Sequence, residues 1–289
     1  MTPERTEIAV RCRGLVKRYT DVVAVDGLDL EVRRGECFGL LGPNGAGKTT
    51  TIEILEGLTE PDAGEVEILG STWSRDGREL RERLGISLQE TQLNEKLTVS
   101  ETVRLFRSFY RRGREPEEVL ALLALDEKRD SRVGKLSGGQ KQRLAVACAL
   151  VGDPEVLFLD EPTTGLDPQS RLQLWRQITG FRAAGGTVLL TTHYMDEAER
   201  VCDRVAIVDR GQVIALGTPA ELISSLQAAN VVEFSSEPEI PEESLRALPG
   251  VREPHRRGAD WSLPVGSLAE TVPALLALVE RSGARLGNL

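Results

Sequence analysis

The feature that most constrains this chain is a glycine-rich octapeptide at residues 42–49. It reads Gly-Pro-Asn-Gly-Ala-Gly-Lys-Thr and fits the spacing G-x-x-x-x-G-K-[ST] at every fixed position. Residues 37–41 before it form a short apolar run typical of a strand, and residues 50–58 after it lack proline and carry apolar residues at helical spacing. A strand that leads through such a loop into a helix is the context in which this motif binds nucleotide phosphates. The chain is therefore predicted to fold around a phosphate-binding loop.

The loop supplies groups suited to a nucleoside triphosphate and its metal ion. Its glycines permit positive φ and close backbone approach, so that successive N–H groups can point at phosphate oxygens. We expect Lys48 to reach the β and γ phosphates and the Thr49 hydroxyl to hold Mg²⁺. The residues expected to contact the nucleotide here are Gly42, Pro43, Asn44, Gly45, Ala46, Gly47, Lys48, Thr49 and Thr50. Alone, the motif predicts a bound nucleoside triphosphate and no particular reaction.

Composition narrows the class of protein further. With 289 residues, 40% of them hydrophobic and 28% charged, the chain has room either for one large domain or for one domain of about 200 residues and a smaller one. No apolar run approaches the ~18 residues that span a bilayer, and residues 1–7 lack the apolar stretch of a signal peptide, so we expect a soluble, cytoplasmic protein. The four cysteines show no C-x-x-C pairing, which argues against a zinc site. The net charge of -9 gives no basic field, and no nucleic-acid partner is expected.

Alternating apolar and polar residues lie on both sides of the loop. Residues 7–34 read as antiparallel strands with a turn at Asp26-Gly27, and residues 65–70 read as a further strand. Residues 83–89 read as a strand that ends in the polar amide of Gln89. Tyr19 ends the first stretch, and its ring either covers a nucleotide base or is that of a half-buried strand residue.

A helical subdomain is expected from about residue 90 to 155, because apolar residues recur at helical spacing between residues 99 and 151. The last of its helices begins at Ser137-Gly138-Gly139-Gln140. Ser137 can cap this helix, and the two glycines leave backbone N–H groups open to an anion.

Two strands of continuous apolar residues end in ionisable side chains. Residues 156–159 precede Asp160 and Glu161, and residues 187–192 precede His193. Because ligands bind at the carboxyl ends of parallel strands, we expect Asp160 to bind Mg²⁺ through water and Glu161 to polarise an attacking water. The alternatives are two solvated acids in a loop and a histidine without a catalytic role. Residues 204–217 then read as a hairpin that closes the domain.

Over residues 7–225 the chain resembles the ATP-binding subunits of ABC transporters. Besides the phosphate loop, Leu136-Ser137-Gly138-Gly139-Gln140 matches the family's signature sequence, which is the more discriminating motif. The remaining matches, in the family's order, are Tyr19 as the adenine-stacking aromatic, Gln89 as the Q-loop glutamine, residues 156–162 as the Walker B strand, residues 165–168 as the D-loop and His193 as the switch histidine. The resemblance implies an α/β phosphate-loop NTPase with a mixed-sheet core, an antiparallel β subdomain and the inserted helical subdomain.

The resemblance also implies a partner copy and a division of roles. Two such domains dimerise head to tail, so that each ATP lies between the phosphate loop of one chain and Ser137, Gly138, Gly139 and Gln140 of the other. Glu161, His193 and Lys48 are then the catalytic residues, and Thr49, Gln89 and Asp160 surround Mg²⁺. Tyr19 contacts the base, and Asp167 of the D-loop couples the two sites across the dimer.

Residues 226–289 are expected to form a small domain. The pattern reads as strand, helix, two strands, helix and strand, which is the order of a ferredoxin-like α+β unit. Ser267 and Glu270 are expected to form a capping box, and Gly283 to mark the exit of the last helix. The family's extension usually runs further, so we expect this domain to be truncated.

This extension makes the chain most similar to the drug-resistance and antibiotic-export subunits of the daunorubicin type. The resemblance implies a motor that hydrolyses ATP at the cytoplasmic face of the membrane and drives a separate integral membrane permease. It leaves the transported substrate open. The main alternative is a soluble ABC-type ATPase acting on ribosomes or nucleic acid, although such proteins usually carry two ATPase cassettes in one chain. A second alternative, a regulatory protein with an inactive site, is opposed by the presence of Lys48, Asp160, Glu161 and His193.

Overall fold

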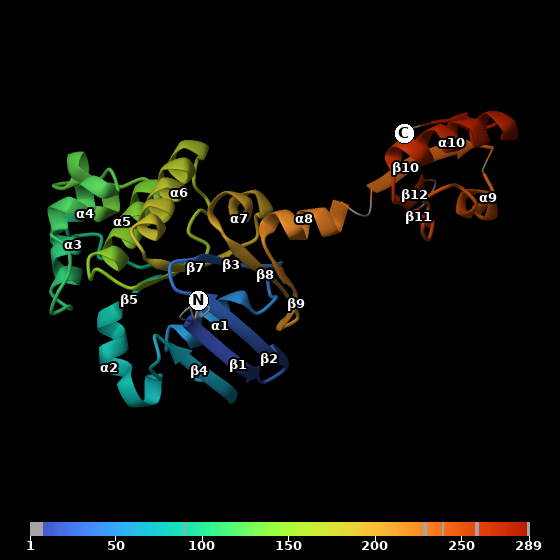
Figure 1. Cartoon of the computed structure of the whole chain (residues 1–289). Helices are drawn as coiled ribbons and strands as arrows, with labels where there is room; N and C mark the ends of the chain where they lie inside the picture. The colour runs from blue at the N-terminus through green and yellow to red at the C-terminus, as the bar shows by residue number, and fades with distance from the viewer. Residues whose placement is uncertain (1–7, 90, 228–229, 239, 258–259, 288–289) are drawn as a thin grey trace, which may run out of the picture. The chain divides into compact units, whose positions relative to one another are not determined.

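The computed structural model describes residues 8–89, 91–227, 230–238, 240–257 and 260–287. The chain divides into two compact units, one ending at Pro219 and the other beginning at Ala220 (Figure 1). The boundary expected after residue 225 lies inside helix α8 (Pro219–Gln227). Residues 1–7, which informed the expectation of a cytoplasmic protein, and residues 288–289 at the expected truncation lie outside the described ranges. Within those ranges, no helix is both long and apolar enough to cross a membrane.

Two sheets form the frame of the first unit. The larger one has the strand order β5-β6-β7-β3-β8-β9, in which only the last pair is antiparallel. Its strands are β3 (Cys37–Leu41), β5 (Leu84–Ser87), β6 (Val156–Leu159), β7 (Thr187–Thr192), β8 (Arg204–Asp209) and β9 (Gln212–Gly217). The smaller sheet is antiparallel, in the order β2-β1-β4, and consists of β1 (Ile8–Tyr19), β2 (Val22–Arg33) and β4 (Ala63–Ile68).

Helices cover these sheets and form the expected helical insertion. The helices outside the insertion are α1 (Lys48–Leu55), α2 (Trp73–Arg83), α6 (Pro168–Ala183) and α7 (Met195–Val201). The insertion consists of α3 (Val99–Arg107), α4 (Pro116–Leu122), α5 (Gly138–Leu150) and the 3₁₀ turns Asp126–Lys128 and Val133–Lys135. Figure 1 shows α3, α4 and α5 grouped together near β5, the edge strand of the larger sheet, so the insertion lies beside the core.

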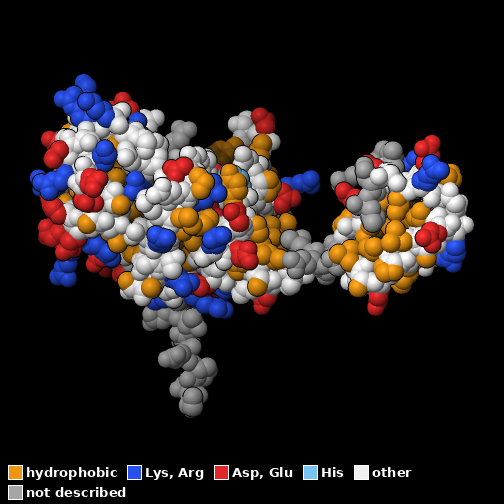
Figure 2. Space-filling model, turned by 90° about the horizontal axis from the view of Figure 1, so that it is seen from above, with side chains coloured by type: hydrophobic (Ala, Val, Ile, Leu, Met, Phe, Trp, Pro, Cys, Tyr) orange, Lys and Arg blue, Asp and Glu red, His pale blue; other side chains and the backbone are white. Residues whose placement is uncertain are grey.

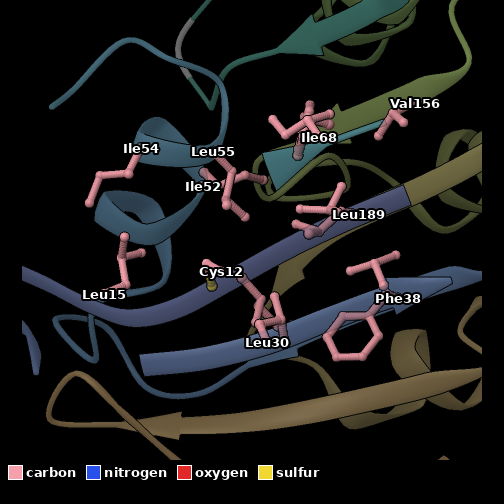
Figure 3. Close-up of a cluster of buried hydrophobic side chains, with 14 of the residues drawn as sticks. Cys12, Leu15, Leu30, Phe38, Ile52, Ile54, Leu55, Ile68, Val156 and Leu189 are labelled. Carbon is pink, nitrogen blue, oxygen red and sulfur yellow. The ribbon is translucent and has the colours of Figure 1, made fainter. Parts of the chain in front are cut away.

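One hydrophobic cluster joins both sheets through α1. Strands β3, β6 and β7 are buried along their whole lengths, which is typical of parallel strands covered on both faces. The apolar side chains of β1 and β2 alternate with polar ones and point to the core from a sheet with one solvated face. Between them lie Ile52, Ile54 and Leu55 of α1, in contact with the cluster that Figure 3 shows. The phosphate loop is thus fixed at both ends in one core.

Three details of the first unit differ from the sequence-based expectations. Asp26-Gly27 is not a turn: it lies within β2, where Leu15 pairs with Leu28 and Val16 with Asp26, so that Gly27 is the additional residue of a bulge. Its φ of 71° suits glycine, and the chain instead reverses at residues 20–21. The helix after the phosphate loop ends at Leu55 because Gly57, at φ 72°, leaves the helical conformation. Helix α2 was not expected.

The second unit follows the order β10 (Asn230–Glu237), α9 (Glu242–Arg246), β11 (His255–Arg257), β12 (Asp260–Val265), α10 (Leu268–Ser282) and β13 (Arg285–Leu286). Its antiparallel sheet has the order β11-β12-β10-β13, and Phe234, Leu263 and Leu275 lie in its own core. The expected capping box is wrong, because the Ser267 side chain makes no capping hydrogen bond at its extended backbone, with φ -147° and ψ 115°. Gly283 ends α10 in the left-handed conformation, as expected.

Candidate functional site

The phosphate loop connects β3 to α1. Its sequence requires glycine at several positions for two different structural reasons. A Cβ at Gly42 would lie 2.2 Å from the carbonyl oxygen of Val208, and one at Gly47 would lie 2.2 Å from that of Ala24. The loop is therefore packed against neighbouring backbone from two sides. Gly45, by contrast, has φ 79° and open space where a Cβ would be, so it is the backbone conformation that selects glycine there.

Lys48 is almost fully buried and holds the loop in its curved form. Its Nζ donates to the carbonyl oxygens of Gly42, at 2.8 Å, and Pro43, at 3.0 Å. The same Nζ lies 3.8 Å from Oε1 of Glu161. A cation at the mouth of a loop of backbone N–H groups is suited to a polyphosphate.

Asp160 and the threonines around it form the group best suited to a metal ion. The hydroxyl of Thr191 donates to Asp160 Oδ1, and the side chain of Thr49 is also hydrogen bonded to this carboxyl. Burial raises the pKa of the Asp160 carboxyl above its usual value, against the opposing effect of these hydrogen bonds. A buried carboxylate beside a hydroxyl is a set of oxygen donors that fits Mg²⁺. When bound, Mg²⁺ would neutralise phosphate charge, and the residues that would hold it are Thr49 and Asp160.

Glu161 is placed by its backbone and by three neighbours. Its φ is 45°, a left-handed conformation that is uncommon outside glycine, and its N–H donates to Thr191 Oγ1 at 2.8 Å. The Thr164 hydroxyl donates to Glu161 Oε2 at 3.0 Å, and His193 Nδ1 lies 3.4 Å from Oε1. A strained, nearly buried carboxylate that faces both a lysine and a histidine is typical of a reacting centre.

The phosphate loop and Glu161 line a cavity of about 380 Å³, a size suited to a small-molecule ligand. Tyr19 and Gln89, which lie far from the loop in sequence, both line it, and both are exposed. The lining consists of Tyr19, Val22, Ala24, Asn44, Gly45, Gly47, Lys48, Thr49, Thr50, Gln89 and Glu161. Around this cavity the structure therefore brings together the expected base-stacking ring, the phosphate loop, the Q-loop glutamine and Glu161. Asp160 and His193 are not among the lining residues, and they reach the site through Thr49 and Glu161.

The signature residues do not line this cavity. Ser137 caps α5: its hydroxyl accepts from the Gln140 N–H at 3.3 Å, and Gln140 Oε1 accepts from the Ser137 N–H at 3.0 Å. Gly138 is exposed with open space where a Cβ would be, whereas a Cβ at Gly139 would lie 2.9 Å from Ser170 Oγ. Among the described residues, the start of α5 is therefore an open helix N-terminus that lies outside the phosphate-loop cavity.

Asp167 also lies outside the cavity. It is the N-cap of α6, and its carboxylate accepts from the N–H groups of Gln169 and Ser170, both at 3.0 Å, and from the Ser170 hydroxyl at 2.6 Å. These hydrogen bonds, the one from the Ser170 hydroxyl first, lower the pKa of Asp167. Because a Cβ on Gly139 would lie 2.9 Å from Ser170 Oγ, Asp167 and the signature segment are neighbours.

Comparison with known proteins agrees with this arrangement. A family model described as ABC transporter matches residues 25–164. The Nod factor export ATP-binding protein I of Burkholderia orbicola is 46% identical over 229 residues, which are 77% of this chain and 75% of that protein. The chain belongs to the ABC transporter ATP-binding proteins.

Two further comparisons extend this result. The Nod factor export ATP-binding protein I of Cupriavidus metallidurans is 40% identical over 282 residues, covering 96% of this chain and 91% of that protein. The solved structure of an ATP-binding subunit of an ABC transporter superposes on this chain with a TM-score of 0.69 and 31% identity, covering 76% of this chain and 93% of that one. A dimeric bacterial ABC transporter cassette superposes with a TM-score of 0.67 and 26% identity, covering 73% of this chain and 98% of that one. The chain is thus an ABC ATPase, with ATP as substrate and Mg²⁺ as cofactor.

Two residues of the ABC ATPase site were missed by the sequence analysis. Thr191 links Asp160 to the backbone of Glu161, and Thr164 holds the free carboxylate oxygen of Glu161. In the sequence, Thr191 is only one residue of a predicted apolar strand. Its contacts with Asp160 and Glu161 arise because β7 pairs with β6. No local pattern in the sequence distinguishes it from Thr192.

Proposed function

We propose that this chain is the motor subunit of an exporter, in which two copies close head to tail around two ATP molecules at the cytoplasmic face of the membrane. The observation that carries this proposal is the separation of the two halves of the site within one chain. The phosphate loop opens into its cavity without a signature helix, and the start of α5 is an open helix N-terminus without a phosphate loop. A second copy supplies to each cavity the helix N-terminus that it lacks, and a dimeric cassette is among the similar structures.

Hydrolysis in this scheme uses the chain's own groups in defined roles. Glu161 accepts the proton of the water that attacks the γ-phosphorus, and the bond from that phosphorus to the bridging oxygen of ADP breaks. Lys48 and the N–H groups of the phosphate loop stabilise the charge on the phosphate oxygens. His193, directly after β7, contacts the γ-phosphate. Gln89 transmits the state of the nucleotide to the permease. Asp167 couples the two sites across the dimer interface.

The proposed cargo class is a drug, an antibiotic or a lipid-like molecule, exported through a separate integral membrane permease. Its support is the name of the relatives, which are Nod factor export ATP-binding proteins. The alternative of an ATPase that acts on ribosomes or nucleic acid is not favoured by these relatives.

The composite site predicts that Glu161→Gln traps a dimer. The amide keeps the shape of the carboxylate but cannot accept the proton of water, so ATP is bound and not hydrolysed. We expect the variant to elute as a dimer with ATP and Mg²⁺ in size-exclusion chromatography, with turnover lowered by about 10²-fold or more. Glu199→Gln, an exposed change on α7, is the matched control. Equal turnover by wild type and Glu161→Gln would remove Glu161 from the mechanism.

Lys48→Ala tests the role of the phosphate loop in binding ATP. Removing the ammonium leaves the carbonyls of Gly42 and Pro43 without their donor and the phosphates without their cation. We expect ATP affinity to fall by about 10²-fold or more, measured by fluorescent nucleotide titration. Unchanged affinity would contradict this role for the lysine.

The exporter assignment is tested by its partner. The full chain, purified with its membranes in mild detergent, is expected to bring down an integral membrane protein. If the chain stays wholly in the soluble fraction and sediments with ribosomes, the transporter proposal is wrong.

A further inference from the structure

A bend after β7 brings the rings of His193 and Tyr194 together. Successive side chains of an extended strand point to opposite faces, so neighbouring rings along a strand do not normally meet. Here the chain bends at His193, and the N–H of Tyr194 donates to the hydroxyl of the buried Thr192 at 3.0 Å. The two ring centroids lie 4.0 Å apart, with 41° between the ring planes. The Tyr194 ring therefore packs on the imidazole whose Nδ1 lies 3.4 Å from Glu161 Oε1.

The Tyr194 ring is covered in turn by Arg171 of α6. The guanidinium carbon lies 5.2 Å from the ring centroid, within the range of a cation–π interaction. Figure 2 shows acidic and basic side chains interspersed at the surface on one face of the first unit, where water solvates them. Arg171 differs, because its Nε is buried without a hydrogen-bond partner and its side chain forms no ion pair in the described part of the chain. Stacking on Tyr194 therefore accounts for the position of this guanidinium.

This stack connects His193 with the helix that Asp167 caps. Arg171 lies one turn into α6, and its N–H donates to the carbonyl oxygen of Asp167 at 3.0 Å. A second contact joins α6 to α7, which Figure 1 shows beside each other: Trp175 Nε1 donates to Oε1 of the buried Glu197 at 2.9 Å. The stack from α6 to His193 therefore lies between two helices whose spacing is fixed.

The ring of Tyr194 makes these contacts, and its hydroxyl does not. Among the described residues, that hydroxyl has no hydrogen-bond partner. Neither Tyr194 nor Arg171 lines the nucleotide cavity, so their effect on the reaction passes through His193. Packing against a reacting group restricts its rotamers, and a misplacement of about 1 Å can lower a rate by up to about 10²-fold.

We propose that Tyr194 and Arg171 are positioning residues for ATP hydrolysis: Arg171 holds the Tyr194 ring, and this ring holds the imidazole of His193 at Glu161. The placement of His193 thereby depends on α6, whose N-cap Asp167 lies at the dimer interface in the proposed function. This inference rests on the role that the proposed function gives to His193, and it adds the two residues through which α6 supports that role.

Steady-state ATP hydrolysis by the full chain tests the positioning role. Tyr194→Leu removes the ring and is expected to lower kcat by about tenfold, while KM for ATP and the affinity for a fluorescent nucleotide stay within about twofold of wild type. Tyr194→Phe keeps the ring and is expected to retain kcat within about twofold. Arg171→Met keeps the length of the side chain without its charge and is expected to lower kcat by about threefold. Arg176→Met, at an exposed arginine of the same helix, is the matched control and should leave kcat unchanged.

The two positioning residues are expected to act as one unit. Because Arg171 works through the Tyr194 ring, Arg171→Met should have no further effect once Tyr194→Leu is present. The double variant should therefore lie about tenfold below wild type in kcat and not about thirtyfold. A thirtyfold loss would mean that the two residues act independently, and it would overturn the connection from α6 to His193.

His193→Ala distinguishes a failure of this inference from a failure of the proposed function. It is expected to lower kcat by about 10²-fold or more. If it does so while Tyr194→Leu keeps the kcat of wild type, the proposed function stands and the positioning role is wrong. If His193→Ala itself keeps the kcat of wild type, the role of His193 in the proposed function is wrong and the positioning role falls with it.

Two further results would overturn the positioning role alone. If Tyr194→Leu loses ATP affinity to the same extent as kcat, the ring serves the folding of the whole site. If Tyr194→Phe loses as much kcat as Tyr194→Leu, the hydroxyl is what the reaction needs, and the stack of Arg171, Tyr194 and His193 is not.

Discussion

Glu56, at the end of α1, is buried without a hydrogen-bond partner for either carboxylate oxygen in the described part of the chain. Burial, followed by the charges of Asp160 and Glu53, raises its pKa to about 8 from an ordinary value of 4.5. The folded state therefore holds a proton that the unfolded state has released between pH 4.5 and 8. The free energy of unfolding must fall as pH rises through this window.

We predict that Glu56→Gln removes this pH dependence. The amide has the same shape and never ionises, so the variant should gain up to roughly 4 kcal/mol over wild type at pH 8.5 and much less at pH 5. Urea titrations at the two pH values measure the difference. Glu53→Gln, on a partly exposed neighbour in the same helix, is the control and should show little pH-dependent gain. A gain that is the same at both pH values would show that burial does not protonate Glu56.

At the scale of the element, the start of α5 combines a structural role with the proposed contact to the partner's ATP. The Ser137 hydroxyl accepts the Gln140 N–H, and Gly138 leaves the same helix end open. We predict that Ser137→Ala lowers stability by about 1 kcal/mol through loss of the cap. Ser137→Asp keeps a capping oxygen and should retain that stability, yet its charge would repel a γ-phosphate brought by the second copy.

The discriminating measurement is thus thermal unfolding alongside ATP-driven dimerisation in the Glu161→Gln background. Ser137→Asp is expected to unfold like wild type and to stay monomeric with ATP. If it dimerises normally, the start of α5 does not face the partner's phosphate.

Elements defined by strong local patterns were predictable from the sequence, and those defined by tertiary contacts were not. The continuous apolar runs at β3, β6 and β7 and the helical spacing around α5 led to the observed elements. Helix α2 was missed because only Leu80 of its eleven residues is buried and its backbone is kinked at Asp76. Gly27 was misread because a bulge and a turn have the same local composition, and only the pairing with β1 distinguishes them. Thr191 likewise acquires its role from a neighbouring strand.

For the whole molecule, the division into two units has a thermodynamic consequence. Each has a hydrophobic cluster of its own, centred on residues such as Phe38 in the first and Phe234 in the second, both buried to within 1%. We predict that Phe234→Ala lowers the stability of the second unit by about 3 to 5 kcal/mol and leaves ATP binding unchanged. Phe38→Ala should instead destabilise the unit that holds the phosphate loop and weaken ATP binding with it. Differential scanning calorimetry should show two transitions, each shifted by only one of the variants. A single transition that both variants lower equally would mean that the two units unfold as one.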